Sequence, residues 1–192
     1  MDPLIVDPLS GPARSWLFVP ADRHDRFAKA AGSGADRVIV DLEDALPPGA
    51  KDDARRRLVD AVLPEGRPVY VRVNAVGTEW FEEDLRVAVR LPVAGLLLPK
   101  AESAEHVARA VASLGAAQRV VPIVESAAGV WNVLDIARAP RVERLAFGAV
   151  DLALDAGMED VGEVWEIVVF FKLTIPMNQI VFKRKILIVF KS

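Results

Sequence analysis

The chain has 192 residues, an apolar fraction of 52%, a charged fraction of 27% and a formal net charge of −3. This balance is typical of a globular protein with one sizeable core, and the absence of a basic stripe argues against a nucleic-acid partner. The lack of cysteine excludes disulfides, thiolate metal sites and cysteine nucleophiles, and it fits a cytoplasmic protein. Residues 1–13 lack the pattern of a secretory signal, and no apolar run approaches the ~18 residues of a membrane span.

Six short apolar segments predict six strands, and they recur about every 25 residues with a helical pattern between them. Strict alternation of continuous apolar strands with helices indicates a parallel sheet covered by helices. The predicted strands are Ser15–Pro20, Asp36–Leu42, Pro68–Asn74, Ala94–Lys100, Val120–Ala127 and Leu145–Asp151.

Two α/β architectures fit this alternation, an open doubly wound sheet and a TIM (β/α)8-type barrel. No G-x-G-x-x-G follows a strand and no G-x-x-x-x-G-K-[ST] is present, so neither nucleotide-binding signature is supported. Polar residues instead follow most of the predicted strands, which favours the barrel, whose chemistry is spread over many strand ends. We therefore expect an incomplete barrel of six clear β-α units. The polar strand-end residues are Asp41, Glu43, Asp44, Arg72, Asn74, Lys100, Glu102, Glu125 and Asp151.

Helix boundaries are predicted from capping residues and apolar periodicity. A helix is expected from about Ala50 to Leu63, with Leu58 facing inward. Thr78 and Ser103 are predicted to be the N-caps of the next two helices, because their hydroxyls accept hydrogen bonds from free backbone amides.

Glu125 and Asp151 each end an apolar run. If the two runs are neighbouring parallel strands, the carboxylates emerge side by side. Two hard oxygen ligands on rigid strand ends suit Mg²⁺, with water and substrate completing the octahedron. The alternative is that each acid is a solvated residue at the end of its strand.

The composition changes near Glu163, after which alanine disappears and lysine replaces arginine as the main cation. We divide the chain into a barrel lyase domain, residues 1–163, and an atypical tail, residues 164–192. One interpretation of the tail makes Ile167–Leu173 and Ile186–Phe190 surrogate strands seven and eight. The other, which we favour at this stage, makes it foreign to the design, with the barrel left truncated.

Six strand-end motifs occur in the order and spacing of a known family. They are Ser15–Ala21, Val40–Ala45, Val71–Asn74, Leu98–Glu102, Val124–Ala127 and Phe147–Leu152. Together they resemble the citrate lyase beta subunit family, part of the HpcH/HpaI aldolases, over about residues 14–160. The resemblance implies a TIM barrel that assembles into trimers or hexamers and uses Mg²⁺ as its cofactor.

The resemblance also implies roles for individual residues. The metal ligands fall on Glu125 and Asp151, and Arg72 takes the position that grips a substrate carboxylate. Gly148 and Asp151 are implied to line the substrate site. Arg72 has an alternative role, which is to pair with a neighbouring acid in the barrel mouth.

Further roles are implied around the second predicted strand. Glu43 and Asp44 are implied to act in catalysis by holding substrate or a water molecule on the metal, although they could equally form a turn before Pro47. Arg23 and Lys29 match positions near the phosphates of coenzyme A in relatives. For Asp41 and Lys100 two roles stay open, a functional one and a structural one as ion-pair partners.

The implied reaction is cleavage of a 3-hydroxyacyl-CoA, such as citryl-CoA, malyl-CoA or citramalyl-CoA, into an acyl-CoA and a 2-oxo acid. The leaving enolate needs a proton donor, and in relatives a neighbouring subunit supplies an acid for this step. The tail offers only Glu163 and Glu166. Two alternatives stay open: a CoA-independent aldolase acting on hydroxy-oxo acids, and an inactive truncated family member.

Overall fold

The computed structural model describes residues 13–157, 167–174, 181–183 and 187–189, with side chains described for 13–157. Its core is a sheet whose first six strands are parallel and pair in chain order. These strands are β1 Trp16–Pro20, β2 Arg37–Asp41, β3 Val69–Arg72, β4 Gly95–Leu98, β5 Arg119–Val124 and β6 Leu145–Gly148.

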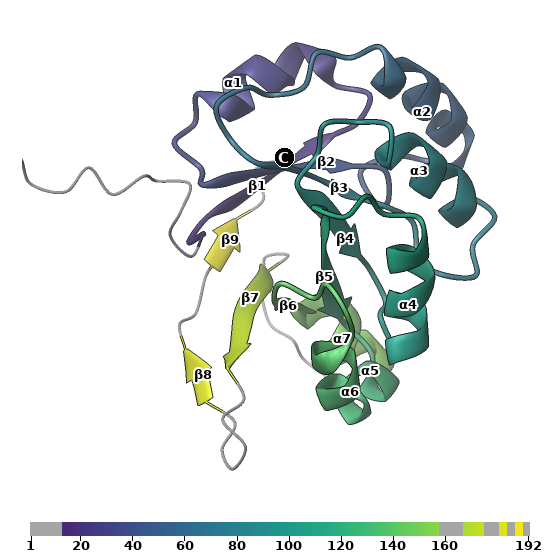
Figure 1. Cartoon of the computed structure of the whole chain (residues 1–192), viewed down its shortest axis with the longest axis vertical. Helices are drawn as coiled ribbons and strands as arrows, with labels where there is room; N and C mark the ends of the chain where they lie inside the picture. The colour runs from purple at the N-terminus through teal and green to yellow at the C-terminus, as the bar shows by residue number, and fades with distance from the viewer. Residues whose placement is uncertain (1–12, 158–166, 175–180, 184–186, 190–192) are drawn as a thin grey trace, which may run out of the picture.

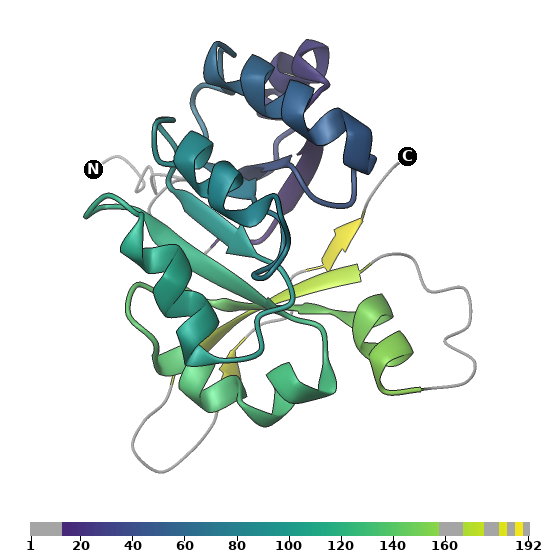
Figure 2. The same ribbon diagram turned by 90° about the vertical axis from the view of Figure 1, so that its right-hand side faces the viewer.

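Helices connect the parallel strands, and α1 to α4 cover the convex side of the curled sheet (Figures 1 and 2). This arrangement is a half-barrel, so the predicted incomplete TIM-type α/β fold is confirmed. None of the helices in the described part of the chain has the length and apolar character that a membrane crossing requires. The helical segments are η1 His24–Arg26, α1 Phe27–Ala31, η2 Pro48–Ala50, α2 Lys51–Val59, α3 Phe81–Ala88, α4 Ala104–Ala112, α5 Ala127–Trp131, α6 Val133–Arg138 and α7 Ala149–Asp155.

Three further strands follow the half-barrel, and they run antiparallel to their partners. β7 (Ile167–Thr174) pairs with β6, and β8 (Val181–Lys183) and β9 (Leu187–Val189) both pair with β7. β9 also lies beside β1, so these strands occupy the open side of the half-barrel (Figure 1). The positions of β7 and β9 agree with the two strands considered for the tail, whereas β8 was not predicted. A regular barrel would continue with parallel strands. The division at residue 163 stays a prediction.

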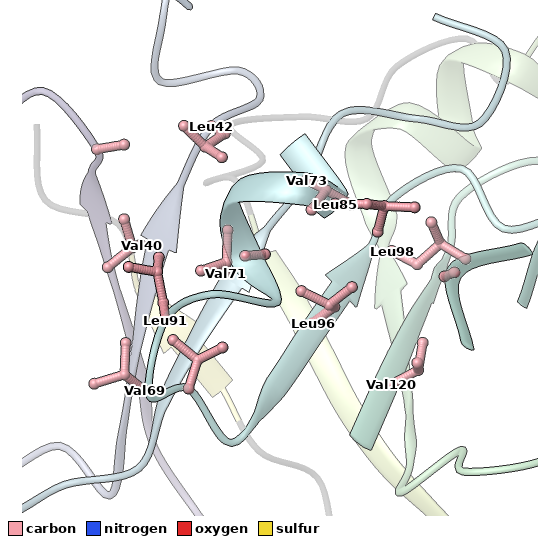
Figure 3. Close-up of a cluster of buried hydrophobic side chains, with 14 of the residues drawn as sticks. Val40, Leu42, Val69, Val71, Val73, Leu85, Leu91, Leu96, Leu98 and Val120 are labelled. Carbon is pink, nitrogen blue, oxygen red and sulfur yellow. The ribbon is translucent and has the colours of Figure 1, made fainter. Parts of the chain in front are cut away.

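The convex face of the sheet is the larger hydrophobic core. Val40, Val71 and Leu96, on three adjacent strands, contribute to this core together with Leu85 of α3 (Figure 3). All four side chains are buried. Burying each such side chain contributes about 1.5–3 kcal/mol to the hydrophobic stabilisation of the fold.

The concave face carries the alternate residues of the same strands, because successive side chains point to opposite sides of a sheet. Ile39, Tyr70, Leu97 and Ile123 form a second apolar cluster there, around Trp16. Two residues further along β2, β3 and β5, toward the carboxyl ends of the strands, the side chains on this face are charged. The register places two of them, Asp41 and Arg72, directly opposite each other.

One of the two predicted N-caps is confirmed and the other is wrong. Ser103 is the N-cap of α4 and accepts a hydrogen bond from the His106 amide at 3.2 Å. The Thr78 prediction is wrong: α3 begins at Phe81, and the Thr78 hydroxyl donates to the Ala75 carbonyl instead. Threonine's hydroxyl serves both as a donor and as an acceptor, so the local turn competes with the cap. The helix predicted over 50–63 is shorter, at 51–59.

Candidate metal and substrate site

A buried ion pair forms the centre of the site at the carboxyl ends of β2 and β3. Arg72 donates from Nε and Nη2 to the two carboxylate oxygens of Asp41, at 2.8 and 2.6 Å. The Arg72 guanidinium also lies over the Phe18 ring, with its Cζ 4.9 Å from the ring centroid. Burial lowers the pKa of Arg72, but Asp41, together with Glu43 and Asp44, outweighs this effect and raises it above its ordinary value. Asp41 is therefore a structural partner that orients Arg72, one of the two roles considered from the sequence.

The remaining nitrogen of Arg72 faces the predicted acidic cluster. Its Nη1 lies 3.1 Å from Glu43 Oε2 and 3.4 Å from Asp44 Oδ2. The Glu43 contact is an ion pair without hydrogen-bond geometry, so the buried Oε2 has no hydrogen-bond partner among the described residues. Burial raises the pKa of Glu43 to about 8, because Arg72 only partly offsets desolvation and the neighbouring carboxylates oppose ionisation further.

Glu125 follows β5 directly and is 7% exposed. Its Oε1 accepts a hydrogen bond of 2.7 Å from the backbone amide of Lys100. Lys100 adopts a left-handed conformation, with φ at 49°, which is uncommon for a residue with a side chain and is concentrated at functional sites. A side-chain carbon at Gly148 would overlap Glu125, so glycine at this position leaves room for the carboxylate. Burial raises the pKa of Glu125 to about 7, and the charge of Asp151 adds to the shift.

Asp151 lies in the first turn of α7, not on a strand as predicted. β6 ends earlier, at Gly148, because the chain turns directly into the helix there. The charge of Asp151 contributes to the raised pKa of Glu125, and the pairing of the two acids as metal ligands stays a prediction. Burial lowers the pKa of Lys100, but four acids that include Glu43 and Asp151 outweigh burial and raise it. Lys100 thus faces the acidic site, without an ion pair within 4 Å among the described residues.

Acids outnumber cations in this region. Asp41, Glu43, Asp44, Glu125 and Asp151 stand against Arg72, Lys100 and Lys51. No three acidic or histidine side chains among the described residues approach closely enough to form a complete metal cluster. Two buried carboxylates with raised pKa values and an unpartnered oxygen are nevertheless what a divalent cation would compensate. The residues present fit a site in which protein supplies part of the coordination shell and water or substrate the rest.

A cavity of about 820 Å³ opens beside the Asp41–Arg72 pair, between β1, α1 and the carboxyl ends of β2 and β3. Lys29 lines it, and its predicted role toward an anionic ligand stays a prediction. Arg23 is not among the lining residues, and its guanidinium donates to Asp25 at 2.9 and 2.7 Å. The lining residues are Leu17, Phe18, Val19, Pro20, Asp25, Arg26, Lys29, Ala30, Ser33, Asp41, Asp44, Ala45 and Arg72.

The structure adds polar residues that sequence patterns did not single out. Lys51, at the start of α2, donates to the backbone carbonyls of Leu42 and Glu43. Asp84 of α3 is fully buried and accepts from both the backbone and the side-chain amide of Asn74. Their sequence contexts are ordinary helix positions, and an acid one turn into an amphipathic helix gives no signal that it points inward.

The HpcH/HpaI aldolase/citrate lyase family matches residues 14–183. The chain belongs to this family. The match confirms the resemblance found in the strand-end motifs and extends past residue 163 into β7 and β8.

Curated family members are similar over much of this chain. A citrate lyase subunit beta-like protein of Mycobacterium tuberculosis is 42% identical over 142 residues, which are 74% of this chain and 50% of that protein. In Cereibacter sphaeroides, a (3S)-malyl-CoA thioesterase is 35% identical over 149 residues, which are 76% of this chain and 52% of that protein. An L-malyl-CoA/beta-methylmalyl-CoA lyase there is 34% identical over 173 residues (81% and 54%). The chain thus spans about half the length of the curated relatives it matches.

Solved structures agree with the half-barrel. The citrate lyase beta subunit of Mycobacterium tuberculosis, complexed with oxaloacetate and magnesium, superposes with a TM-score of 0.70 at 39% identity, covering 79% of this chain and 65% of that one. The CitE protein of that organism, in complex with magnesium, acetoacetate and coenzyme A, superposes with a TM-score of 0.69 at 38% identity. The match covers 79% of this chain and 54% of that one. Magnesium in these family members agrees with the cofactor predicted from the paired acids.

Proposed function

We propose that this protein is a Mg²⁺-dependent carbon–carbon lyase that cleaves a 3-hydroxyacyl-CoA into an acyl-CoA and a 2-oxo acid. The observation that carries the proposal is the surplus of buried acids around Arg72 and Glu125 at the carboxyl end of a half-barrel of this family. Relatives that act on malyl-CoA, and neighbours that hold magnesium with 2-oxo acids or coenzyme A, support the substrate class.

Glu125 and Asp151 are the residues that would hold the magnesium ion. When bound, the ion would supply Lewis-acid stabilisation for charge that develops on a 2-oxo acid as the carbon–carbon bond breaks. The Lys100 amide donates to one oxygen of Glu125 and so holds the carboxylate in a set orientation for the ion that it would bind. Preorganisation of this kind lowers the reorganisation needed when substrate binds.

Arg72 is suited to bind a substrate carboxylate through Nη1, since Asp41 already occupies Nε and Nη2. The guanidinium stays charged at every physiological pH, and its planar geometry matches a carboxylate. Glu43 lies against the same nitrogen and holds a proton near neutral pH in the metal-free protein. Glu43 is therefore placed to exchange a proton with a group bound at Arg72. We assign this catalytic role to Glu43, and a lesser part in it to Asp44.

The cavity beside Arg72 is the proposed path of the acyl-CoA. Lys29 would meet its phosphates, with Arg26 a better second candidate than Arg23, because Asp25 already neutralises Arg23. Glu163 and Glu166, the tail acids considered as proton donors, lie outside the described residues. We retain assembly into a homo-oligomer and a cytoplasmic location as parts of the proposal.

Hydrolysis of the thioester is a second candidate, because one relative of 35% identity is a (3S)-malyl-CoA thioesterase. The two reactions give different products from malyl-CoA. A lyase releases acetyl-CoA and glyoxylate, whereas a thioesterase releases malate and free coenzyme A.

The test is product analysis of the purified protein with citryl-CoA, malyl-CoA and citramalyl-CoA in the presence of Mg²⁺. Formation of an acyl-CoA together with a 2-oxo acid, abolished by a chelator, is expected. Free coenzyme A without a 2-oxo acid would assign the thioesterase reaction. Release of pyruvate from hydroxy-oxo acids without coenzyme A would identify the protein as a CoA-independent aldolase. If no substrate is turned over while the metal is shown to be bound, the protein is an inactive family member.

A further inference from the structure

Lys51 is a buried lysine whose ammonium group has no carboxylate as a direct partner in the described chain. It is 4% exposed, and its Nζ donates to the carbonyl oxygens of Leu42 at 2.8 Å and of Glu43 at 2.6 Å. The Nζ also lies 5.2 Å from the centroid of the Trp80 ring. Two carbonyls and an aromatic face thus surround the ammonium group.

This position is unfavourable for a lysine on general grounds. Lys51 is the first residue of α2, where the helix dipole favours acids, and Asp52 and Asp53 follow it in the expected way. Burial also lowers the pKa of Lys51, although several acids nearby oppose this effect. A charge that is both buried and set against the helix dipole requires strong compensating contacts, and the two carbonyls supply them.

The two carbonyls belong to the turn that carries the acidic cluster. Asp41 accepts from the Glu43 amide at 2.9 Å and the Ala45 amide at 3.3 Å, and the Leu46 amide donates to the Glu43 carbonyl at 3.2 Å. Lys51 holds the same turn from the opposite side. With its backbone fixed on both sides, the turn directs the Glu43 side chain toward Arg72.

A second buried group reinforces this support. The Asn74 side-chain amide donates to the Leu42 carbonyl at 2.9 Å, next to Lys51. Asp84 holds Asn74 in place and is itself held by Arg55 of α2 at 2.8 Å. The helix that provides Lys51 is therefore tied to the same network through a second side chain.

We propose that Lys51 is the positioning residue of the site: it clamps the Leu42 and Glu43 carbonyls and thereby keeps the Glu43 carboxylate against Arg72. The effect of this positioning on catalysis rests on the proposed function, because only there does Glu43 act on substrate. The clamp itself is a property of the fold and is testable without turnover.

Amide hydrogen exchange tests the clamp. In Lys51→Met, exchange over residues 41–46 should accelerate about 10-fold or more, while β4 and β5 keep their protection, because only the local opening free energy falls. Arg57→Met is the matched control, since it removes an exposed cation from the same helix and no contact to the turn. Uniform acceleration across the sheet, or unchanged exchange over 41–46, would overturn the proposal. If Lys51→Met does not fold, Lys51→Gln takes its place, because the side-chain amide keeps N–H donors without the charge.

Two further measurements separate positioning from metal binding and from general destabilisation. The Kd for Mg²⁺ alone should stay within about threefold of the parent value in Lys51→Met, because the predicted ligands lie on other elements. The kcat with the active acyl-CoA should fall about 100-fold with little change in KM, as for a misplaced catalytic group. Lys51→Arg should recover protection over 41–46 and part of kcat. A parent protein without lyase activity would refute the proposed function, and the exchange experiment would still decide the clamp.

Discussion

At the amino end of the concave face, Tyr70 donates its hydroxyl to Glu143 at 2.5 Å, and Glu143 pairs with Arg144 at 3.3 Å. Arg144 also donates to the Ala13 carbonyl and lies over the Trp16 ring. At the carboxyl end of the same strands, acids outnumber cations, and the carboxylates with raised pKa values crowd around one guanidinium.

Both ends carry buried polar groups on the same face of the sheet. The difference between them lies in how their charges are compensated. At the amino end each ionised group has an opposite charge, a carbonyl or an aromatic ring beside it, as expected for groups that only stabilise the fold. At the carboxyl end burial raises the pKa of Glu43 to about 8 and that of Glu125 to about 7, and the nearby positive charge offsets this effect only in part. Incomplete compensation therefore distinguishes the candidate site from the structural polar cluster.

Removal of Arg72 should give the largest effect on stability and activity. Arg72→Met leaves the Asp41 carboxylate buried without its bidentate partner and should destabilise the fold by about 3–5 kcal/mol. It should also abolish lyase turnover. Urea unfolding and the acyl-CoA assay measure the two effects. Arg72→Lys keeps the charge but cannot reproduce the bidentate pairing with Asp41, and full activity in that variant would contradict a role for the Asp41-oriented guanidinium in binding substrate.

Glu125→Gln should weaken Mg²⁺ binding by at least about 10-fold, because an amide replaces a charged ligand. In the parent protein the affinity should rise as the pH increases from 6 to 8, since the pKa of Glu125 is about 7 and the ion binds the deprotonated form. Calorimetry at three pH values measures both trends. Glu143→Gln, the same change at the amino end, should leave Mg²⁺ affinity unaltered, and an equal loss there would break the contrast between the two ends.

Glu43→Gln should stabilise the metal-free protein by about 4 kcal/mol at pH 8 and about 1 kcal/mol at pH 5. The pKa of Glu43 is raised from 4.5 to about 8, so the folded protein binds more protons than the unfolded chain in this window. Its contribution to stability therefore falls as the pH rises through the window, and glutamine removes that loss. Chemical unfolding at both pH values in a chelator is the measurement. Glu83→Gln, on the exposed side of α3, serves as the control with no such pH dependence.

Tyr70→Phe should have the smallest effect, about 1 kcal/mol of destabilisation, through loss of the hydrogen bond to Glu143. Thermal unfolding should show the same decrease with and without Mg²⁺. Kinetic constants should match the parent protein. A change in kcat in this variant would mean that the amino end of the concave face is coupled to the site.

The six parallel strands could be predicted from the sequence because each is an apolar run bounded by polar or turn residues. Their order along the chain then placed Arg72 and Glu125 at the same end of the sheet. The partner of Arg72 could not be predicted in this way, since the contact with Asp41 depends on the register between β2 and β3. Asp151 was placed on a strand because its run, Leu145–Asp151, stays apolar through the first turn of α7.

The supporting residues were harder to predict. Lys51 contacts backbone carbonyls eight and nine residues earlier, and a carbonyl acceptor leaves no trace in side-chain patterns. Asp84 occupies the first turn of α3 beside Glu82 and Glu83, where acids are expected for electrostatic reasons alone. The sequence does not distinguish the buried acid in this run from the exposed ones.

The close approach of Gly148 to Glu125 has a consequence for sequence divergence within the family. A methyl group at position 148 would occupy the space of the glutamate carboxylate, so the two positions cannot vary independently. An aspartate at 125 would withdraw the carboxylate by one methylene, but the Cβ of residue 125 would still lie 2.9 Å from a side-chain carbon at 148. Related sequences that keep an acid at 125 should therefore keep glycine at 148, and a larger residue there would identify chains in which the backbone, and with it the metal geometry, has shifted.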